Sequence, residues 1–195
     1  MAPTPAVRTG RPRDLDLTRR LLDGAVDLVA ERGYGELNAE VLALRTGAGK
    51  SAIYRRWPDM SALLADALGR VRLVEPPPAT GSLRGDLVAL VQPAVPPADV
   101  LQRAIGSVVG EARHDPRLRA TLDRALVAPL AEAAALVCER ESARGRLVDL
   151  ARQRLLHRLL QALWWERCSA AGPALTPAEV DTLVDRVLLP VVRGR

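Results

Sequence analysis

The sequence predicts an all-α protein of about nine helices, built from a small N-terminal unit of three helices and a larger C-terminal helical domain. Two observations lead to this fold class. Apolar residues recur at helical spacing along most of the chain, and each run is bounded by a capping residue, a proline or a glycine. The chain of 195 residues is long enough for one or two domains with a sizeable core.

The N-terminal residues differ from the rest of the chain. Residues 1–13, MAPTPAVRTGRPR, lack helical periodicity and contain three prolines and one glycine, so we expect a flexible basic arm. The arm carries Arg8, Arg11 and Arg13. Arginines on extended arms enter the DNA minor groove in some proteins, whereas the simpler interpretation is a merely soluble terminus. The sequence leaves both interpretations open.

Residues 14–60 hold the most informative stretch, GAGKSAIYRRW at positions 47–57. Ahead of it, Asn38 is placed to cap a helix, and Gly47 suits a left-handed exit from that helix. The next helix stops before Pro58. Two short helices joined by a tight glycine turn describe a helix-turn-helix, a motif whose second helix lies in the DNA major groove.

The charge distribution supports this interpretation locally rather than globally. The net charge of +5 is modest. Positions 41–58, however, contain no acidic residue and four cations, namely Arg45, Lys50, Arg55 and Arg56. A cluster of this kind suits a phosphate backbone, although any single arginine is by default a solvated surface charge.

The same stretch contains one alternative motif. Gly49-Lys50-Ser51 looks like the end of a phosphate-binding P-loop. That loop needs a strand ahead of it and a glycine five residues before the GK glycine, because its backbone amides cradle the phosphates. The position is occupied by Leu44, inside a helical pattern, so the sequence disfavours a P-loop-type nucleotide-binding enzyme.

Residues 61–195 consist of further predicted helices that end at prolines and glycines. Four residues are suited to cap helix starts, namely Asp59, Ser82, Asp99 and Asp115. We expect the helix after Asp59 to run to about Val74, ahead of the prolines at 76–78. Pro129 should kink the helix after Asp115 rather than end it, because apolar periodicity resumes immediately afterwards.

The last two predicted helices carry more apolar surface than a single core contact requires. The apolar stripe between residues 147 and 165 is broad, and a capping box at Thr176-Pro177-Ala178-Glu179 starts the final apolar helix. We expect part of this surface to meet a partner. An ordinary monomeric helical core is the alternative.

No catalytic or metal-binding arrangement stands out in the sequence. Cys138 and Cys168 are isolated, as expected for structural thiols, and the two histidines are too scattered for a metal site. We therefore expect no enzyme activity, no metal and no cofactor. The chain shows neither a secretion signal nor an apolar run long enough to cross a bilayer, so we expect a cytoplasmic protein without a membrane partner.

From Leu21 to Leu64 the chain resembles the DNA-binding domain of the tetracycline-repressor (TetR) family of bacterial regulators. The matching elements are Leu21-Leu22, Ala25, Gly33-Tyr34, Leu42-Ala43, Arg45, Gly47, Lys50, Ile53-Tyr54-Arg55, Trp57-Pro58 and Ala62-Leu63-Leu64. Gly49 departs from the family by replacing a common serine or threonine cap, and Met60 replaces a common lysine. Trp57 replaces a frequent phenylalanine, and we expect its indole to fill the core rather than donate to a phosphate.

The resemblance implies a homodimer that pairs through its last two helices and binds a palindromic double-stranded DNA operator. The expected DNA-contacting residues are Asn38, Arg45, Lys50, Ser51, Ala52, Tyr54, Arg55 and Arg56, together with Arg11 and Arg13 of the arm. Lys50, Tyr54 and Asn38 are better placed for phosphates, whereas Ser51, Ala52 and Arg55 suit base edges.

The resemblance also implies a ligand pocket in the helices after the fourth, where a small-molecule effector shifts the fourth helix and releases the DNA. Trp164 and Trp165 are the only aromatic residues beyond the DNA-binding region that could line it, although a place in the core or dimer interface is the alternative. We expect a ligand-responsive regulator that acts as a repressor. An activator would look the same, and a helical interaction protein without DNA binding remains a further alternative.

Overall fold

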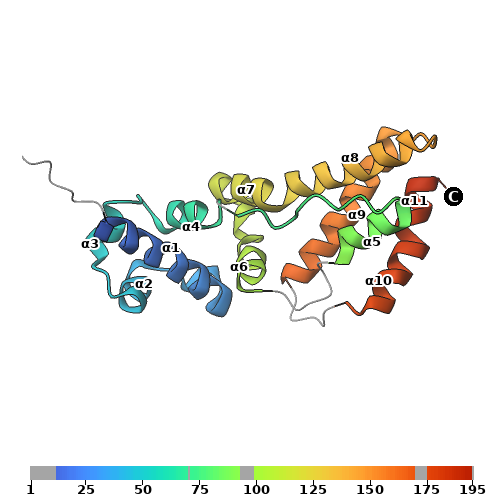
Figure 1. Ribbon diagram of the computed structural model, residues 1–195. Helices are drawn as coiled ribbons and strands as arrows, with labels where there is room; N and C mark the ends of the chain where they lie inside the picture. The colour runs from blue at the N-terminus through green and yellow to red at the C-terminus, as the bar shows by residue number, and fades with distance from the viewer. Residues whose placement is uncertain (1–11, 70, 93–98, 170–174, 195) are drawn as a thin grey trace, which may run out of the picture.

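The computed structural model describes residues 12–69, 71–92, 99–169 and 175–194. Within these ranges every regular element is helical, and the elements join into nine continuous helices. The molecule is elongated, with the N-terminal helices at one end and the C-terminal helices at the other (Figure 1). The predicted all-α fold class is confirmed.

The N-terminal end contains α1 (Pro12–Arg32), η1 (Tyr34–Glu36), α2 (Ala39–Thr46), α3 (Lys50–Tyr54) and α4 (Met60–Leu68). The side-chain oxygen of Asn38 accepts hydrogen bonds from the backbone N–H groups of Glu40 and Val41 at 3.1 and 2.9 Å. Gly47 ends α2 with a φ of 67°, a left-handed conformation that favours glycine. The predicted cap and the predicted turn are both confirmed, and together they set the direction of α3.

The C-terminal part begins after an extended connection. Its elements are α5 (Leu83–Val91), α6 (Val100–Val108), η3 (Glu111–Arg113), α7 (Pro116–Leu122), η4 (Asp123–Val127), α8 (Ala128–Ala143), α9 (Leu150–Ser169), α10 (Pro177–Leu183), η5 (Val184–Leu188) and α11 (Leu189–Arg193). The predicted caps at Ser82, Asp99 and Asp115 are confirmed, as is the capping box at Thr176.

Pro129 does not end its helix, as predicted. A proline has no N–H to donate to the carbonyl four residues earlier, and the helix accommodates it through the π-helical segment η4. The carbonyl of Ala125, which Pro129 leaves without its helical partner, accepts a hydrogen bond from the N–H of Leu73 at 2.9 Å. A residue of the connection between α4 and α5 therefore replaces the bond that Pro129 cannot make.

The predicted end of α4 was wrong, because the helix stops at Leu68 and not near Val74. Residues 71–80 run in an extended conformation along α8 (Figure 1). Arg72 forms an ion pair with Glu132 of α8 at 2.7 Å, and Arg140 of α8 donates to the carbonyl of Pro78 at 3.1 Å. Tertiary bonds to α8 therefore hold this segment extended where the sequence pattern alone favoured a helix.

Two hydrophobic cores stabilise the described residues. The first joins α1 to α4 with α6 and α7, and Leu21, Leu42, Ile53 and Leu63 are fully buried in it. The second is built from α5, α8, α9 and the last helix, which is the continuous run of α10, η5 and α11. Because the first core includes α6 and α7, the helices that carry the DNA-binding motif are packed directly against the C-terminal part. Within the described ranges, no helix has the length and apolar character needed to span a bilayer.

Candidate nucleic-acid interface

Helix α3, the second of the two short helices joined by the glycine turn, is held by one buried face. Ile53 is fully buried, and Trp57, just beyond the helix, is only 7% exposed. The indole Nε1 of Trp57 donates to a carboxylate oxygen of Asp66 in α4 at 3.2 Å. The expectation that Trp57 packs in the core is confirmed, and its N–H is used within the protein.

The opposite face of α3 is open to solvent. Ser51, Tyr54 and Arg55 are exposed, and Ala52 is half-buried beside them. Tyr54 is 54% exposed, which is unusual for an aromatic side chain without a partner surface. Among the described residues, Arg55 makes no ion pair or hydrogen bond through its side chain. This face therefore offers a hydroxyl, a phenol and an unpaired guanidinium to an external partner.

Lys50 and Asn38 lie at the edge of this face with local partners. The ammonium of Lys50 contacts Glu40 of α2 at 2.8 Å, and this hydrogen bond lowers the pKa of the Glu40 carboxyl. Both side chains are exposed, so the pair is weak and exchangeable for a phosphate contact. Asn38 uses its oxygen as the α2 cap, and its amide group donates to the carbonyl of Glu36 at 3.3 Å.

Arg45 and Arg56 bond to groups within the protein, although Arg45 is exposed and Arg56 is half-buried. Arg45 forms a two-bond pair with Glu31 of α1, at 2.6 and 2.7 Å, and lies 3.7 Å from Asp27. Arg56 donates to the carbonyl of Ala52 at 2.8 Å and to the hydroxyl of Thr18 at 3.2 Å. These two arginines brace α2 and α3 against α1, so they differ in role from the unpaired Arg55.

The bracing partners on α1 were not identified from the sequence. Asp27 and Glu31 are four residues apart and therefore share one face of α1, which was the available signal. The arm residues cannot be placed in the same way. Arg11 lies outside the described residues, and so does the side chain of Arg13.

The motif that resembled a P-loop lies in a different setting. The residues ahead of Gly49 form α2 and a glycine turn, and no strand is present in the described part of the chain. Lys50 pairs with Glu40 and lies at the start of a five-residue helix. This geometry lacks the strand-to-helix loop that cradles a phosphate chain.

A second polar cluster joins the DNA-binding motif to α7. Asp59 caps α4 by accepting from the N–H of Ala62 at 2.7 Å, and it also pairs with Arg117 of α7 at 2.8 Å. Reciprocally, Asp115 caps α7 and accepts from the hydroxyl of Ser61 in α4. The hydrogen bonds from Ala62 and Ser61, respectively, are the main causes that lower the pKa values of Asp59 and Asp115. We call these four side chains, Asp59, Ser61, Asp115 and Arg117, the cap clamp.

The two tryptophans proposed for the ligand pocket occupy different environments. Trp164 is 4% exposed within the second core, and the guanidinium of Arg167 lies 5.8 Å from the centre of its ring. Trp165 is half-buried and packs against both cores. Arg167 also donates to the side-chain oxygen of the buried Gln102 in α6 at 2.9 Å. Trp165 therefore lies between the two cores, where α9 meets α6, and Trp164 lies within the second core.

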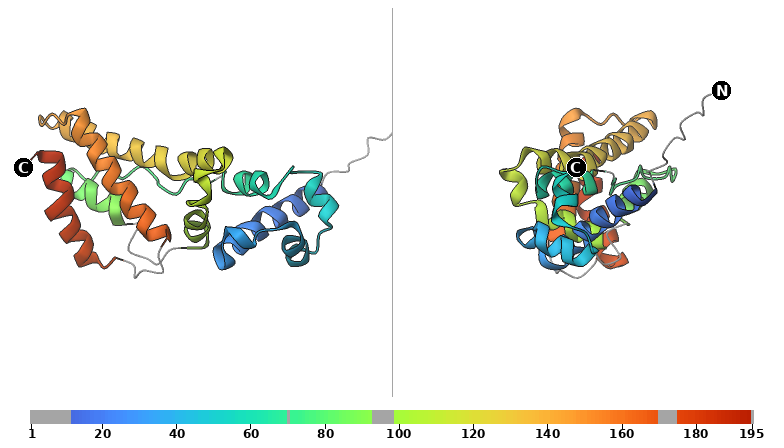
Figure 2. Two further views of the ribbon diagram at one scale, coloured as in Figure 1. Left: turned by 180° about the vertical axis from the view of Figure 1, so that it is seen from behind. Right: turned by 90° about the vertical axis from the view of Figure 1, so that its left-hand side faces the viewer.

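An apolar groove runs along the C-terminal helices. It encloses about 200 Å³, and its lining residues are Leu159, Ala162, Leu163 and Glu166 of α9 with Leu183, Val187 and Leu188 of the last helix. Figure 2 shows α9 and the last helix side by side at this end of the molecule. Val187 of the last helix is 37% exposed, and Leu155 of α9, outside the groove, is 47% exposed, so both helices present apolar side chains to solvent.

Comparison with known proteins points to one family. Residues 21–67 match the family described as "Bacterial regulatory proteins, tetR family", and residues 77–187 match "Tetracyclin repressor-like, C-terminal domain". A DNA-binding transcriptional repressor TetR from Mycobacteroides abscessus is 30% identical over 177 residues, which cover 89% of this chain and 92% of that one.

Two further similarities agree with this assignment. An uncharacterized HTH-type transcriptional regulator from Mycobacterium tuberculosis is 29% identical over 180 residues, covering 92% of this chain and 87% of that one. A transcriptional regulator from Rhodococcus sp. Rha1, of known structure, has a TM-score of 0.66 at 19% identity, covering 91% of this chain and 96% of that one, and so shares the fold. Members of this family are DNA-binding transcription regulators and not enzymes. The chain, with its matching helix-turn-helix and C-terminal domain, belongs to the TetR family of bacterial transcriptional regulators.

Proposed function

We propose that this protein is a cytoplasmic, ligand-responsive repressor that binds a palindromic operator as a homodimer and is released by a small-molecule effector. The observation that carries the proposal is the open face of α3. That face exposes Ser51, Tyr54 and Arg55 while Ile53 anchors the helix from behind. A helix fixed on one side and exposed on the other is what insertion into a major groove requires.

The side chains of this region divide into proposed base contacts and proposed phosphate contacts. Arg55 and Ser51 are placed for base edges, and the methyl group of Ala52 for a thymine methyl. Lys50 and Tyr54 are placed for phosphates, with Lys50 leaving Glu40 on binding. We propose that Asn38 and the arm residues Arg11 and Arg13 contact the backbone at the margins.

Arg45 and Arg56 support this interface in the proposed mechanism. Their bonds to α1 fix the positions of α2 and α3 before DNA arrives, so less conformational freedom is lost on binding. Contacts of these two arginines with phosphates would use the donors that their intramolecular bonds leave available.

We propose that dimers form through the apolar groove of α9 and the last helix. The exposed Val187 and the half-buried leucines of the groove would be buried against the same surface of a second copy in a two-fold arrangement. One recognition helix contacts only a few base pairs, so a dimer is needed to read two half-sites together.

The proposed effector pocket lies near Trp165, between the two cores, with Trp164 as a more buried wall. From there α6 and α7 lead directly to the DNA-binding motif, because they share its core. The cap clamp makes this connection specific: a displacement of α7 pulls on the first turn of α4 through Asp59 and Ser61. Leucine, valine and alanine dominate this part of the chain, which suits an apolar or amphipathic effector.

The proposal is tested by binding purified protein to the intergenic DNA upstream of its own gene, across a salt series, against scrambled DNA of equal length. A preference of about a thousandfold with a steep salt dependence is expected for specific recognition. Equal, weak binding to both DNAs, followed by failure to enrich any sequence from a random library, would contradict it. For the effector, a thermal-shift screen in which only highly charged compounds bind would contradict the proposed pocket.

A further inference from the structure

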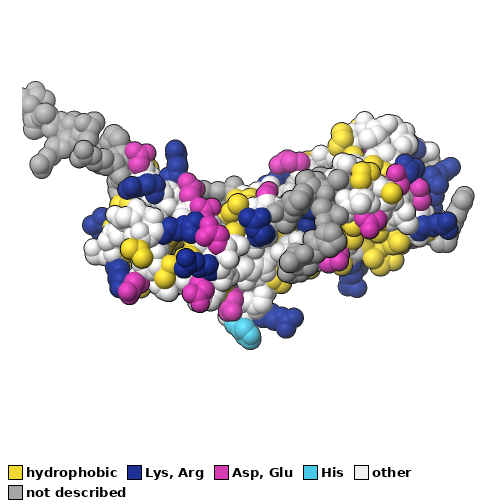
Figure 3. All heavy atoms as spheres, turned by 90° about the horizontal axis from the view of Figure 1, so that it is seen from below, with side chains coloured by type: hydrophobic (Ala, Val, Ile, Leu, Met, Phe, Trp, Pro, Cys, Tyr) yellow, Lys and Arg dark blue, Asp and Glu magenta, His cyan; other side chains and the backbone are white. Residues whose placement is uncertain are grey.

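The C-terminal end of the molecule holds a cavity that the proposed DNA-binding and effector sites do not use. It measures about 170 Å³, and its wall consists of Glu141, Arg146, Leu147, Val148, Arg152, Val192 and Arg193. Four segments meet there: the last turn of α8, the loop between α8 and α9, the first turn of α9, and the end of α11. Figure 3 shows basic side chains at this end, beside apolar ones.

The ionic groups around the cavity leave a surplus of positive charge. Arg146 lies 3.6 Å from Glu141, and Arg152 lies 3.3 Å from Asp149. Arg193, in contrast, forms no ion pair with any described residue. Glu141 and Asp149 are each matched by an arginine, and Arg193 remains as a guanidinium that no acid of the described residues neutralises.

The two acids at the cavity, Glu141 and Asp149, already bond to other groups. Glu141 is 3% exposed and is shared between Arg144 and Arg146, at 3.5 and 3.6 Å. Asp149 accepts from the N–H of Arg152 at 2.9 Å as it caps α9. A free anion is therefore the missing counterpart, and guanidinium groups bind carboxylates and phosphates in two-bond geometry.

The remaining wall residues indicate that the ligand also has an apolar part. Leu147, Val148 and Val192 contribute an apolar surface on the same cavity. Leu147 is 88% exposed, so its side chain is available to cover a ligand rather than committed to the core. The volume equals that of roughly five or six water molecules in the liquid, which fits a small anion with a short apolar chain.

We propose that this cavity is a binding site for a short-chain aliphatic carboxylate. Arg193 and Arg146 hold the carboxylate group, and Leu147, Val148 and Val192 cover the chain. The ligand joins the α8–α9 loop to the end of α11 and so braces the outer ends of the helices that form the apolar groove. Inorganic phosphate is also an anion but has no apolar chain. Comparing phosphate with a short-chain carboxylate therefore separates the contribution of the arginines from that of the apolar wall.

The test is isothermal titration of the full-length protein with sodium butyrate in a buffer free of other carboxylates, sulfate and phosphate. Butyramide, which has the same size without the charge, and inorganic phosphate are titrated separately. Butyrate is expected to bind one site per chain, and butyramide and phosphate to bind at least about tenfold more weakly. Phosphate binding as tightly as butyrate, or no butyrate binding, would overturn the proposal.

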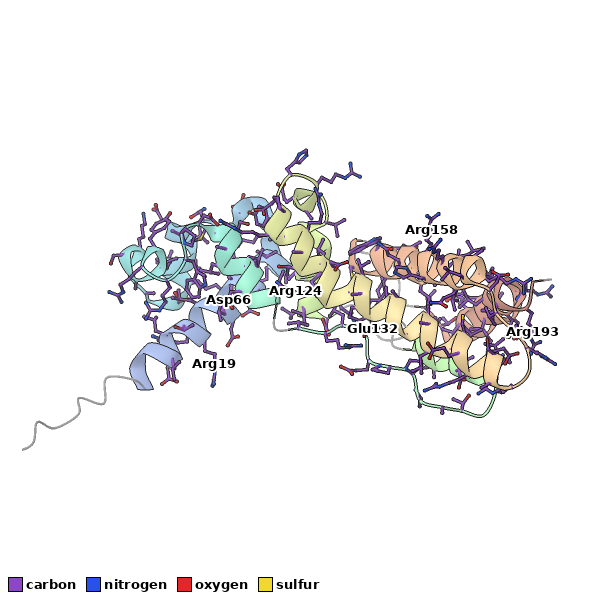
Figure 4. All side chains as sticks on the ribbon, turned by 90° about the horizontal axis from the view of Figure 1, so that it is seen from above. Arg19, Asp66, Arg124, Glu132, Arg158 and Arg193 are labelled. Carbon is purple, nitrogen blue, oxygen red and sulfur yellow. The ribbon has the colours of Figure 1, made fainter. Side chains whose placement is uncertain are left out.

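Variants place the binding at this cavity. The double substitution Arg146→Gln/Arg193→Gln should weaken butyrate binding roughly tenfold or more. Both residues are exposed, so the fold is expected to survive, and an unchanged circular dichroism melt verifies this. Arg158→Gln is the matched control, because Arg158 lies on the exposed middle of α9, away from Arg193 (Figure 4). Equal weakening in the control, or none in the double variant, would overturn the assignment.

Discussion

Two neighbouring arginines follow α3, and replacing each one is expected to change a different property, operator binding for Arg55 and stability for Arg56. Arg55 is exposed and unpaired among the described residues, whereas Arg56 is half-buried and bonded to Ala52 and Thr18. Both were proposed from the sequence as DNA contacts. Arg55→Ala and Arg56→Ala therefore form a matched pair with the same change of charge at adjacent positions.

The structure sets the size of each effect. Arg55→Ala removes no intramolecular bond, so the unfolding free energy should change by less than about 0.5 kcal/mol. Loss of a base contact should cost about 1 to 3 kcal/mol of operator binding, or roughly five- to 150-fold in Kd. Arg56→Ala removes two hydrogen bonds to α1 and α3, which should lower the unfolding free energy by about 1 to 2 kcal/mol.

Urea denaturation followed by circular dichroism, and fluorescence anisotropy with labelled operator, separate these effects. The preference for one base pair should relax in Arg55→Ala, and the Arg56 variant should bind all operators somewhat more weakly without that change. The reasoning is refuted if Arg55→Ala destabilises the protein as much as Arg56→Ala does. It is also refuted if Arg56→Ala alone alters the preferred base with unchanged stability.

Three further outcomes are expected. Val187→Glu puts a charge in the apolar groove and should convert the proposed dimer to a monomer in analytical ultracentrifugation. A dimer that persists in this variant would exclude the groove as the interface. The lowered pKa values of Asp59 and Asp115 mean that the cap clamp stabilises the protein at neutral pH. The folded-state pKa values lie below the ordinary 3.8, and this stability is lost as the pH falls through them, so the melting temperature should decline in that pH range. The decline should be less steep in Ser61→Ala than in the unsubstituted protein, because Asp115 then lacks the hydrogen bond that lowers its pKa most. Burial raises the pKa of both Cys138 and Cys168 to about 11, so neither thiol should react with a disulfide reagent at pH 8 until urea unfolds the chain.

Local sequence signals predicted the elements well where neighbouring residues determine them. The cap at Asn38 and the turn at Gly47 depend on bonds within a few residues, and both lie where the sequence placed them. The continuation through Pro129 followed from apolar spacing, although the π-helical form of η4 did not. The overall fold class rested on such local patterns and on the family resemblance of residues 21–64.

Long-range bonds explain the parts that the sequence did not reveal. The end of α4 depends on Leu73 reaching the carbonyl of Ala125, and the sequence gives no sign of that pairing. Likewise, the sequence alone does not distinguish the roles of Arg45 and Arg55. Arg45 bonds to Glu31 of α1 and so holds α2 in place, whereas Arg55 makes no such bond to a described residue and is available to DNA. Partners that lie on other helices are set by packing, which a single sequence does not display.

Binding to a palindromic operator and to its isolated half-site is the comparison that tests the central claim most directly. Fluorescence anisotropy should show two chains per palindrome, with binding at least about a hundredfold tighter than to a single half-site, because both α3 helices must engage together. Arg55→Ala should reduce that preference. Equal affinity for the palindrome and the half-site, with one chain bound to each, would contradict a dimeric reader of two half-sites.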